Sequence, residues 1–178
     1  MQSDQPKFLV LGLGNDLLGD DAVGLEVIRH LMRAAPTHPQ LKLHETTEMG
    51  LVLLDLLVGC RVAVIVDSIQ TGKVPPGTLH ELDPDQLSCL TGRTPHFLGV
   101  AETLALGRLL GLPMPEQVRV LAVEVADPFT LGTSMTPAVR HAVPVVAERV
   151  AQVLRALGGP DIAQVTLANP TPATRPET

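Results

Sequence analysis

An apolar segment that ends in a glycine turn and a pair of acids constrains the start of this chain more than any other feature. Residues 8–11 are apolar, Gly12 and Gly14 follow, and Asp20 and Asp21 come next. The spacing then changes to that of a helix, with apolar residues at Val23, Val27, Ile28 and Leu31. A strand, a glycine turn and a helix in this order are typical of α/β proteins, which bind ligands beyond the carboxyl ends of their parallel strands. We therefore expect the two acids to lie at a functional edge of a sheet.

The Gly-x-Gly turn does not predict a dinucleotide site. Leu17 stands at the third glycine position of that fingerprint, and the sequence contains no Gly-Lys-Ser or Gly-Lys-Thr. Asp20 and Asp21 would also repel a phosphate at the N-terminus of the helix, where anions otherwise bind. A structural alternative stays open, in which Asp20 caps the helix and Asp21 complements its dipole, stabilising it by about 1–2 kcal/mol.

Two further polar residues stand at the ends of predicted elements. Asp67 ends the nearly unbroken β-branched run of residues 61–67, which is typical of a strand buried on both faces. His96 follows Pro95 at the start of a helical segment, residues 98–110. Carboxylate oxygen and imidazole nitrogen suit zinc, nickel, manganese or iron, and three protein ligands leave positions open for water or substrate. Two acids and one imidazole from these three places therefore form a candidate metal site.

The segments that carry these residues resemble three motifs of the hydrogenase maturation endopeptidases, which trim the C-terminal extension from the large subunit of nickel-containing hydrogenases. The matching segments are residues 12–24, 64–67 and 95–99, in the same order and with similar spacing, and the resemblance covers roughly residues 8–155. It implies a five-stranded twisted sheet. It also implies that Asp21, Asp67 and His96 are the catalytic residues and the residues that contact nickel.

The resemblance further implies an aspartic-type or metal-assisted endopeptidase with no organic cofactor. Nickel would be presented by the substrate, the C-terminal region of a hydrogenase large-subunit precursor, and would mark that precursor as ready for cleavage. The sequence has no His-Glu-x-x-His helix, which disfavours a protease with its own resident zinc. Two alternatives stay open: a non-catalytic chaperone that senses nickel loading with the same residues, and a small-molecule-binding α/β domain.

Other reactive side chains are interpreted as structural. Ser68 and Ser134 lack the Gly-x-Ser-x-Gly elbow of a nucleophile, and Cys60 and Cys89 have no Cys-x-x-Cys partner. Glu45 and Glu48 precede a predicted helix and could line a cleft. The remaining histidines have no matched acidic neighbour in the sequence and are expected to be surface or satisfied polar residues: His30, His38, His44, His80 and His141.

Alternating elements predict a single α/β domain, residues 1–157, with a mostly parallel sheet and helices on both faces. Further strands are expected at residues 41–46, 78–82 and 117–125, the 78–82 segment at an edge, and further helices at residues 50–57 and 137–157. Residues 158–178 are rich in proline and are expected to form a flexible tail. The net charge of −6 gives no basic surface for nucleic acid, and no apolar stretch is long enough to span a membrane. The first seven residues do not resemble a secretory signal, so a cytoplasmic location is expected.

Overall fold

A computed structural model describes residues 6–34, 37–83, 97–132 and 134–162 of the chain. Helices and strands alternate as the sequence predicts, and their bounds agree with the expected ones within about two residues. In chain order the elements are β1 (Phe8–Leu13), the 3-10 helix η1 (Gly19–Ala22), α1 (Val23–Ala34), β2 (Leu41–Thr46), α2 (Leu51–Leu57), β3 (Val62–Ile69), β4 (Leu79–Leu82), α4 (Phe97–Leu109), β5 (Gln117–Glu124) and α5 (Pro137–Ala156).

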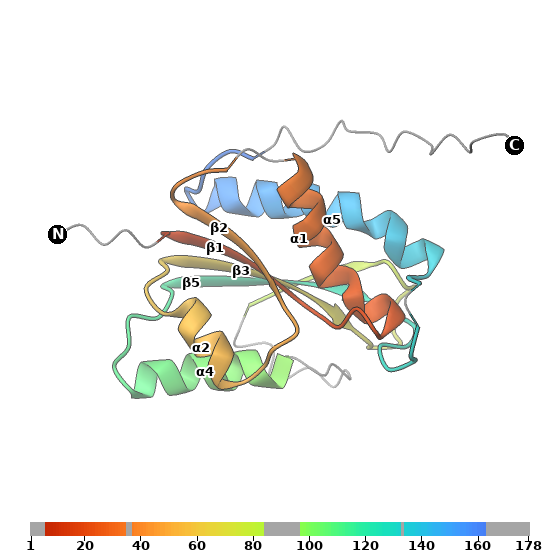
Figure 1. Ribbon diagram of the computed structural model, residues 1–178, viewed down its shortest axis with the longest axis horizontal. Helices are drawn as coiled ribbons and strands as arrows, with labels where there is room; N and C mark the ends of the chain where they lie inside the picture. Colours follow the sequence, from red (N-terminus) through yellow and green to blue (C-terminus); the bar gives the residue numbers. More distant parts are fainter. Residues whose placement is uncertain (1–5, 35–36, 84–96, 133, 163–178) are drawn as a thin grey trace, which may run out of the picture.

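One five-stranded sheet crosses the molecule in the order β2-β1-β3-β5-β4, which confirms the predicted fold class (Figure 1). Strands β2, β1, β3 and β5 are parallel, and the edge strand β4 is antiparallel to β5. Strand β3 continues to Ile69 and pairs with β5 up to Glu124, whereas its pairing with β1 ends at Val66. Asp67 therefore lies just beyond the last residue of β3 that is paired with β1.

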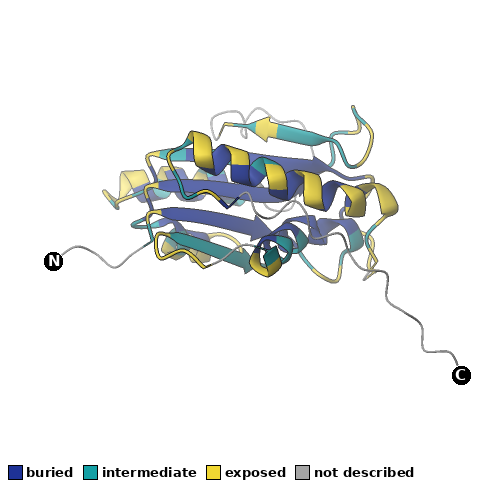
Figure 2. Cartoon of the chain, turned by 90° about the horizontal axis from the view of Figure 1, so that it is seen from above, coloured by how far each residue is buried: buried dark blue, intermediate teal, exposed yellow. Residues whose placement is uncertain are grey.

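Helices cover both faces of the sheet, again as predicted. Helices α1 and α5 pack on one face and α2 and α4 on the other (Figure 1). Alternate residues of β3 enter two separate apolar cores: Val64 packs on the side of α1 and α5, and Ile65 on the side of α2 and α4. The strands in the middle of the sheet are buried, while the outer sides of the helices are exposed (Figure 2). This two-sided burial explains the continuous apolar run of β3.

The C-terminal end of the described chain packs onto the first core. Ile162 is 2% exposed and belongs to the cluster that contains Leu154 of α5. The packed part of the chain thus extends past the expected domain end at residue 157, and residues 163–178 of the expected tail lie outside the described residues. The division into a domain and a flexible tail stays a prediction. Within the described part, no helix is long and apolar enough to cross a membrane.

Candidate functional site

Two glycines allow the start of α1 to lie directly against the ends of β1 and β3. A Cβ on Gly24 would stand 2.1 Å from the carbonyl oxygen of Leu13 and 2.5 Å from that of Val66. A Cβ on Gly14 would stand 2.2 Å from the carbonyl oxygen of Asp21, and the φ of Gly14 is +155°. Any side chain at either position would push η1 and α1 away from the sheet. The glycines therefore place Asp21 at the carboxyl edge of the sheet.

Asp21 and Asp67 meet at this edge, and Ser68 joins them. Both carboxylates are fully buried, and so is Ser68. The hydroxyl of Ser68 donates to Oδ1 of Asp21 at 2.6 Å, and the backbone N–H of Ser68 donates to Oδ1 of Asp67 at 2.8 Å. The structure thus brings together two of the three predicted site residues, and it assigns Ser68 a role between them that the sequence did not reveal.

His96, the third predicted site residue, lies outside the described residues, which resume at Phe97 with the first turn of α4. Among the residues that the structure describes, no group of three His, Cys, Asp or Glu side chains is arranged to hold a metal ion. Asp21 and Asp67 each supply hard carboxylate oxygens beside Ser68, a donor type that suits a divalent cation whose other ligands come from elsewhere. The three-residue site therefore stays a prediction.

Asp20 does not have the capping role that the structural alternative gave it. Its carboxylate accepts hydrogen bonds from the backbone N–H of Thr136 at 2.6 Å and from the Thr136 hydroxyl at 2.9 Å. Thr136 is the N-cap residue of α5, and η1 itself has no side-chain cap. Asp20 thus connects the site segment to the start of α5, and the idea that it caps its own helix is wrong.

A second buried acid, Glu124, stands at the end of β5 and was not expected from the sequence. Oε1 accepts from the backbone N–H groups of Thr71 and Gly72, both at 2.8 Å, and Oε2 accepts from the Thr71 hydroxyl at 2.8 Å. His80 Nε2 lies 2.9 Å from Oε2. Burial alone would raise the pKa of Glu124, but the bonds from Thr71, Gly72 and His80 outweigh it and hold that pKa below its ordinary value. His80 is therefore a satisfied polar residue, as expected, and its acidic partner stands 44 positions away in the sequence.

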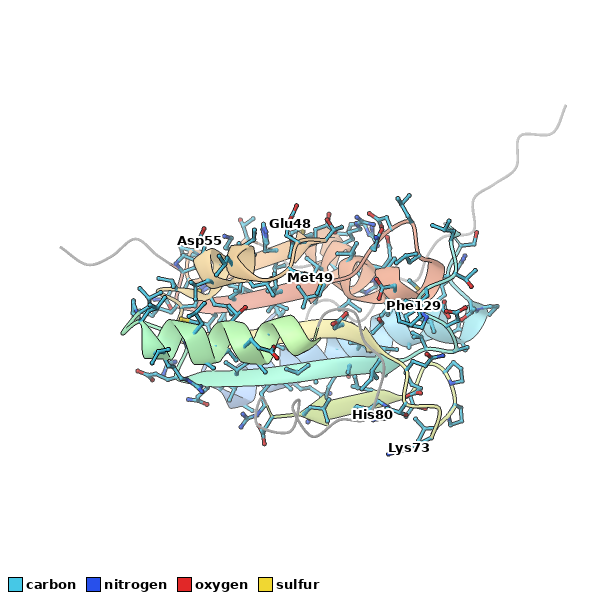
Figure 3. All side chains as sticks on the ribbon, turned by 90° about the horizontal axis from the view of Figure 1, so that it is seen from below. Glu48, Met49, Asp55, Lys73, His80 and Phe129 are labelled. Carbon is cyan, nitrogen blue, oxygen red and sulfur yellow. The ribbon has the colours of Figure 1, made fainter. Side chains whose placement is uncertain are left out.

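Glu45, one of the acids expected to line a cleft, is held in an ion pair. Arg29 contacts Glu45 at 2.7 Å, Asp16 at 2.7 Å and Glu26 at 2.9 Å. The hydrogen bonds from Arg29 lower the pKa of Asp16. Glu48 is exposed (Figure 3). With Glu45 paired to Arg29 and Glu48 turned to solvent, we give neither glutamate a part in the site.

Two of the serine and cysteine side chains that we interpreted as structural are considered next, Ser134 and Cys60. Ser134 is exposed, and Cys60 is buried. Burial raises the pKa of the Cys60 thiol, which keeps it in the unreactive protonated form at neutral pH. Cys89 lies outside the described residues.

Known proteins similar to this chain act in hydrogenase maturation. A family model described as hydrogenase maturation protease matches residues 25–153, a segment that includes Asp67 and His96 and begins after Asp21. The hydrogenase expression/formation protein HupD of Thiocapsa roseopersicina is 28% identical over 161 residues, which cover 89% of this chain and 72% of HupD. The hydrogenase 2 maturation protease of Escherichia coli is 28% identical over 154 residues, which cover 85% of this chain and 93% of that protein.

A solved structure agrees with these similarities. The hydrogenase maturating endopeptidase HybD from E. coli matches this fold with a TM-score of 0.77 at 28% identity, over 85% of this chain and 94% of HybD. The similarities favour a peptidase over the chaperone and small-molecule-binding alternatives.

Proposed function

Since this chain belongs to the hydrogenase maturation protease family and is a peptidase, we propose that it cleaves the C-terminal extension from the large-subunit precursor of a nickel-containing hydrogenase after nickel insertion. Asp21, Asp67 and His96 are the proposed site residues, and they engage the nickel ion that the precursor carries. The observation that carries this proposal is the meeting of Asp21 and Asp67 through Ser68 at the carboxyl edge of the sheet. That edge is the usual place for a binding site in an open α/β sheet.

The donor set is suited to a cation that arrives already held by another molecule. Two carboxylates and one imidazole bind a borderline metal through three ligands and leave positions for ligands of the substrate. Free metal should bind weakly, and affinity should rise when precursor thiolates complete the coordination. The metal therefore belongs to the substrate in this proposal, and no organic cofactor takes part.

Two chemical contributions to peptide hydrolysis are available at such a site. A carboxylate can accept the proton of the attacking water, which is the aspartic-type contribution. A bound cation polarises the scissile carbonyl, which is the metal-assisted contribution. Asp21 and Asp67 are the residues of this chain that hold or accept the proton, and His96 supplies a nitrogen ligand.

The proposed partner is the C-terminal region of the precursor. The net charge of −6 and the lack of basic patches in the sequence support a partner other than nucleic acid. The expected cytoplasmic location stays a prediction.

The test compares apo and nickel-loaded precursor incubated with the purified protein, with loss of the C-terminal extension followed by mass. Wild type should cleave only the loaded form. Asp21→Asn and Asp67→Asn keep the shape of the side chains and remove their charge, and His96→Ala removes the imidazole, so all three should lose cleavage. The matched control is Asp55→Asn, because Asp55 is an exposed acid of α2 at the end of the molecule away from Phe129 (Figure 3).

Two outcomes would contradict the proposal. Equal cleavage of apo and loaded precursor would show that nickel does not mark the substrate. Full activity in all three site variants would show that these residues do not form the site.

A further inference from the structure

Three large apolar side chains are exposed to solvent on two loops, one just before and one bonded to the segment that carries Asp20 and Asp21. Leu17 is 62% exposed on the loop between β1 and η1, and Phe129 and Leu131 are 49% and 79% exposed on the loop between β5 and α5. We call these three residues the apolar loop patch. Groups of exposed apolar side chains commonly mark interaction sites.

Hydrogen bonds hold the two loops of the patch against each other. The backbone N–H of Gly132 donates to the carbonyl of Leu17 at 2.9 Å, and the N–H of Gly19 donates to the carbonyl of Gly132 at 2.5 Å. Leu18 and Gly132 form an isolated parallel β-bridge. Within the second loop, the N–H of Phe129 donates to the Asp127 carboxylate at 2.8 Å. Hydrogen bonds therefore fix the conformation of the two loops that expose the patch to solvent.

Further hydrogen bonds connect the two loops to the acidic segment of the site. The backbone N–H of Asp21 donates to the carbonyl of Leu18 at 2.9 Å, and the Asp20 carboxylate binds Thr136 just after the second loop. Figure 3 shows Phe129 at the end of the molecule opposite Asp55. Leu17 of the patch thus directly precedes the residue whose carbonyl bonds Asp21.

We propose that the apolar loop patch binds an apolar segment of the hydrogenase precursor that flanks the scissile bond. This inference rests on the proposed function and adds the chemistry by which the substrate is recognised. The acids beside the patch are already engaged, because Asp16 pairs with Arg29 and Asp127 bonds its own loop. The surface open to a partner is thus apolar, and the net charge of −6 disfavours an acidic segment. Burial of leucine and phenylalanine side chains against apolar residues of the precursor would supply the affinity.

The experiment measures kcat and KM for cleavage of the nickel-loaded precursor by Leu17→Ser and Leu131→Ser variants. Each should raise KM by about tenfold, the effect of losing about half the burial of one leucine, and should leave kcat within about twofold. The matched control is Leu109→Ser, since Leu109 is 83% exposed at the end of α4, outside the patch. That control should leave both constants unchanged.

An unchanged KM in both patch variants overturns the inference. A fall in kcat at constant KM also overturns it, because it would mean that the loops only support the acids.

Light scattering of wild type and Leu131→Ser tests whether the patch instead joins two copies of this chain. A wild-type dimer that Leu131→Ser breaks would also overturn the inference. If wild type cleaves no precursor, the proposed function fails, and the patch is then judged by binding alone. Precursor binding that is lost in Leu131→Ser and kept in Leu109→Ser supports the patch, and equal binding overturns it.

Discussion

Replacing Ser68 with alanine removes one hydrogen bond from the centre of the site and changes little else. Alanine fits the strand, and its backbone N–H can still donate to Oδ1 of Asp67. What disappears is the hydroxyl that donates to Oδ1 of Asp21 at 2.6 Å. That distance falls in the range of O–H to carboxylate bonds with an ionised acceptor, which are stronger than neutral ones.

The expected cost follows from burial. Asp21 and Ser68 are both 0% exposed, so water does not readily replace the lost donor. A hydrogen bond to a charged group contributes about 1.5–3 kcal/mol, and we therefore expect Ser68→Ala to lower the free energy of unfolding by about 2 kcal/mol. For a domain of this size, that corresponds to a fall of about 4–8 °C in the midpoint of thermal unfolding.

Urea titration and calorimetry of the purified protein measure this effect. Ser134→Ala is the control, because Ser134 is exposed and its truncation should change the free energy of unfolding by less than about 0.5 kcal/mol. The double variant with Asp21→Asn isolates the cause: Ser68→Ala should cost at least about 1 kcal/mol less when the charge on residue 21 is gone. Equal costs in both backgrounds, or a Ser68→Ala variant as stable as wild type, would refute the reasoning.

Three further substitutions test the packing around the site. Gly24→Ala should lower the free energy of unfolding by about 3 kcal/mol, measured by urea titration, because the added Cβ would meet two backbone carbonyls. Gly132→Ala is the control and should be nearly neutral, because the space around its Cβ is open. Similar costs for the two variants would contradict the close approach of α1 to the sheet. Glu124→Ala should cost about 3 kcal/mol at pH 7, since buried donors lose their acceptor. The folded-state pKa of Glu124 lies below its ordinary 4.5, so its stabilising contribution is present above about pH 4.5 and is lost as the pH falls through the folded value. The difference in free energy of unfolding between wild type and Glu124→Ala should therefore shrink in acid. A difference that stays constant with pH would contradict this. Ile162→Ala should lower the free energy of unfolding by about 2–4 kcal/mol, because Ile162 is buried in the core. Truncation after Ile162 should leave the melting midpoint unchanged in calorimetry. A truncation that lowers the midpoint, together with an Ile162→Ala variant that does not, would show that the tail is packed.

The sequence predicts the fold well because its elements differ in periodicity and burial. Strand β3 is recognisable from its apolar run, since all eight of its residues are buried. Its end is less predictable: the β-branched run stops at Asp67, but pairing with β5 extends the strand to Ile69. The residue at which a strand ends depends on its pairing with the neighbouring strand, and the local sequence does not show where that pairing stops.

Much less of the site's hydrogen bonding could be predicted. The glycine turn and the strand end indicate where Asp21 and Asp67 lie, because both belong to local patterns. The Ser68 bond to Asp21 spans 47 positions in the chain, and the Thr136 bond to Asp20 spans 116. Such bonds follow from how the elements pack, so the sequence offers only the local alternative, in which Asp20 caps its own helix, and does not reveal the contact with Thr136 at the start of α5.

The pair of buried carboxylates leads to a last prediction, on metal binding. The carboxylates of Asp21 and Asp67 are fully buried, and each accepts a hydrogen bond from Ser68. Carboxylate oxygens are ligands of divalent cations, so we expect a cation to bind at this edge of the sheet. Cadmium added to the purified protein should therefore raise its melting midpoint, with a stabilisation of about 2.7 kcal/mol when the free ion is at 100 times its dissociation constant. Asp67→Asn should weaken this response and Asp55→Asn should not. A midpoint that millimolar cadmium leaves unchanged, or an equal rise in Asp67→Asn and wild type, would place the cation site elsewhere and leave the two acids with a structural role alone.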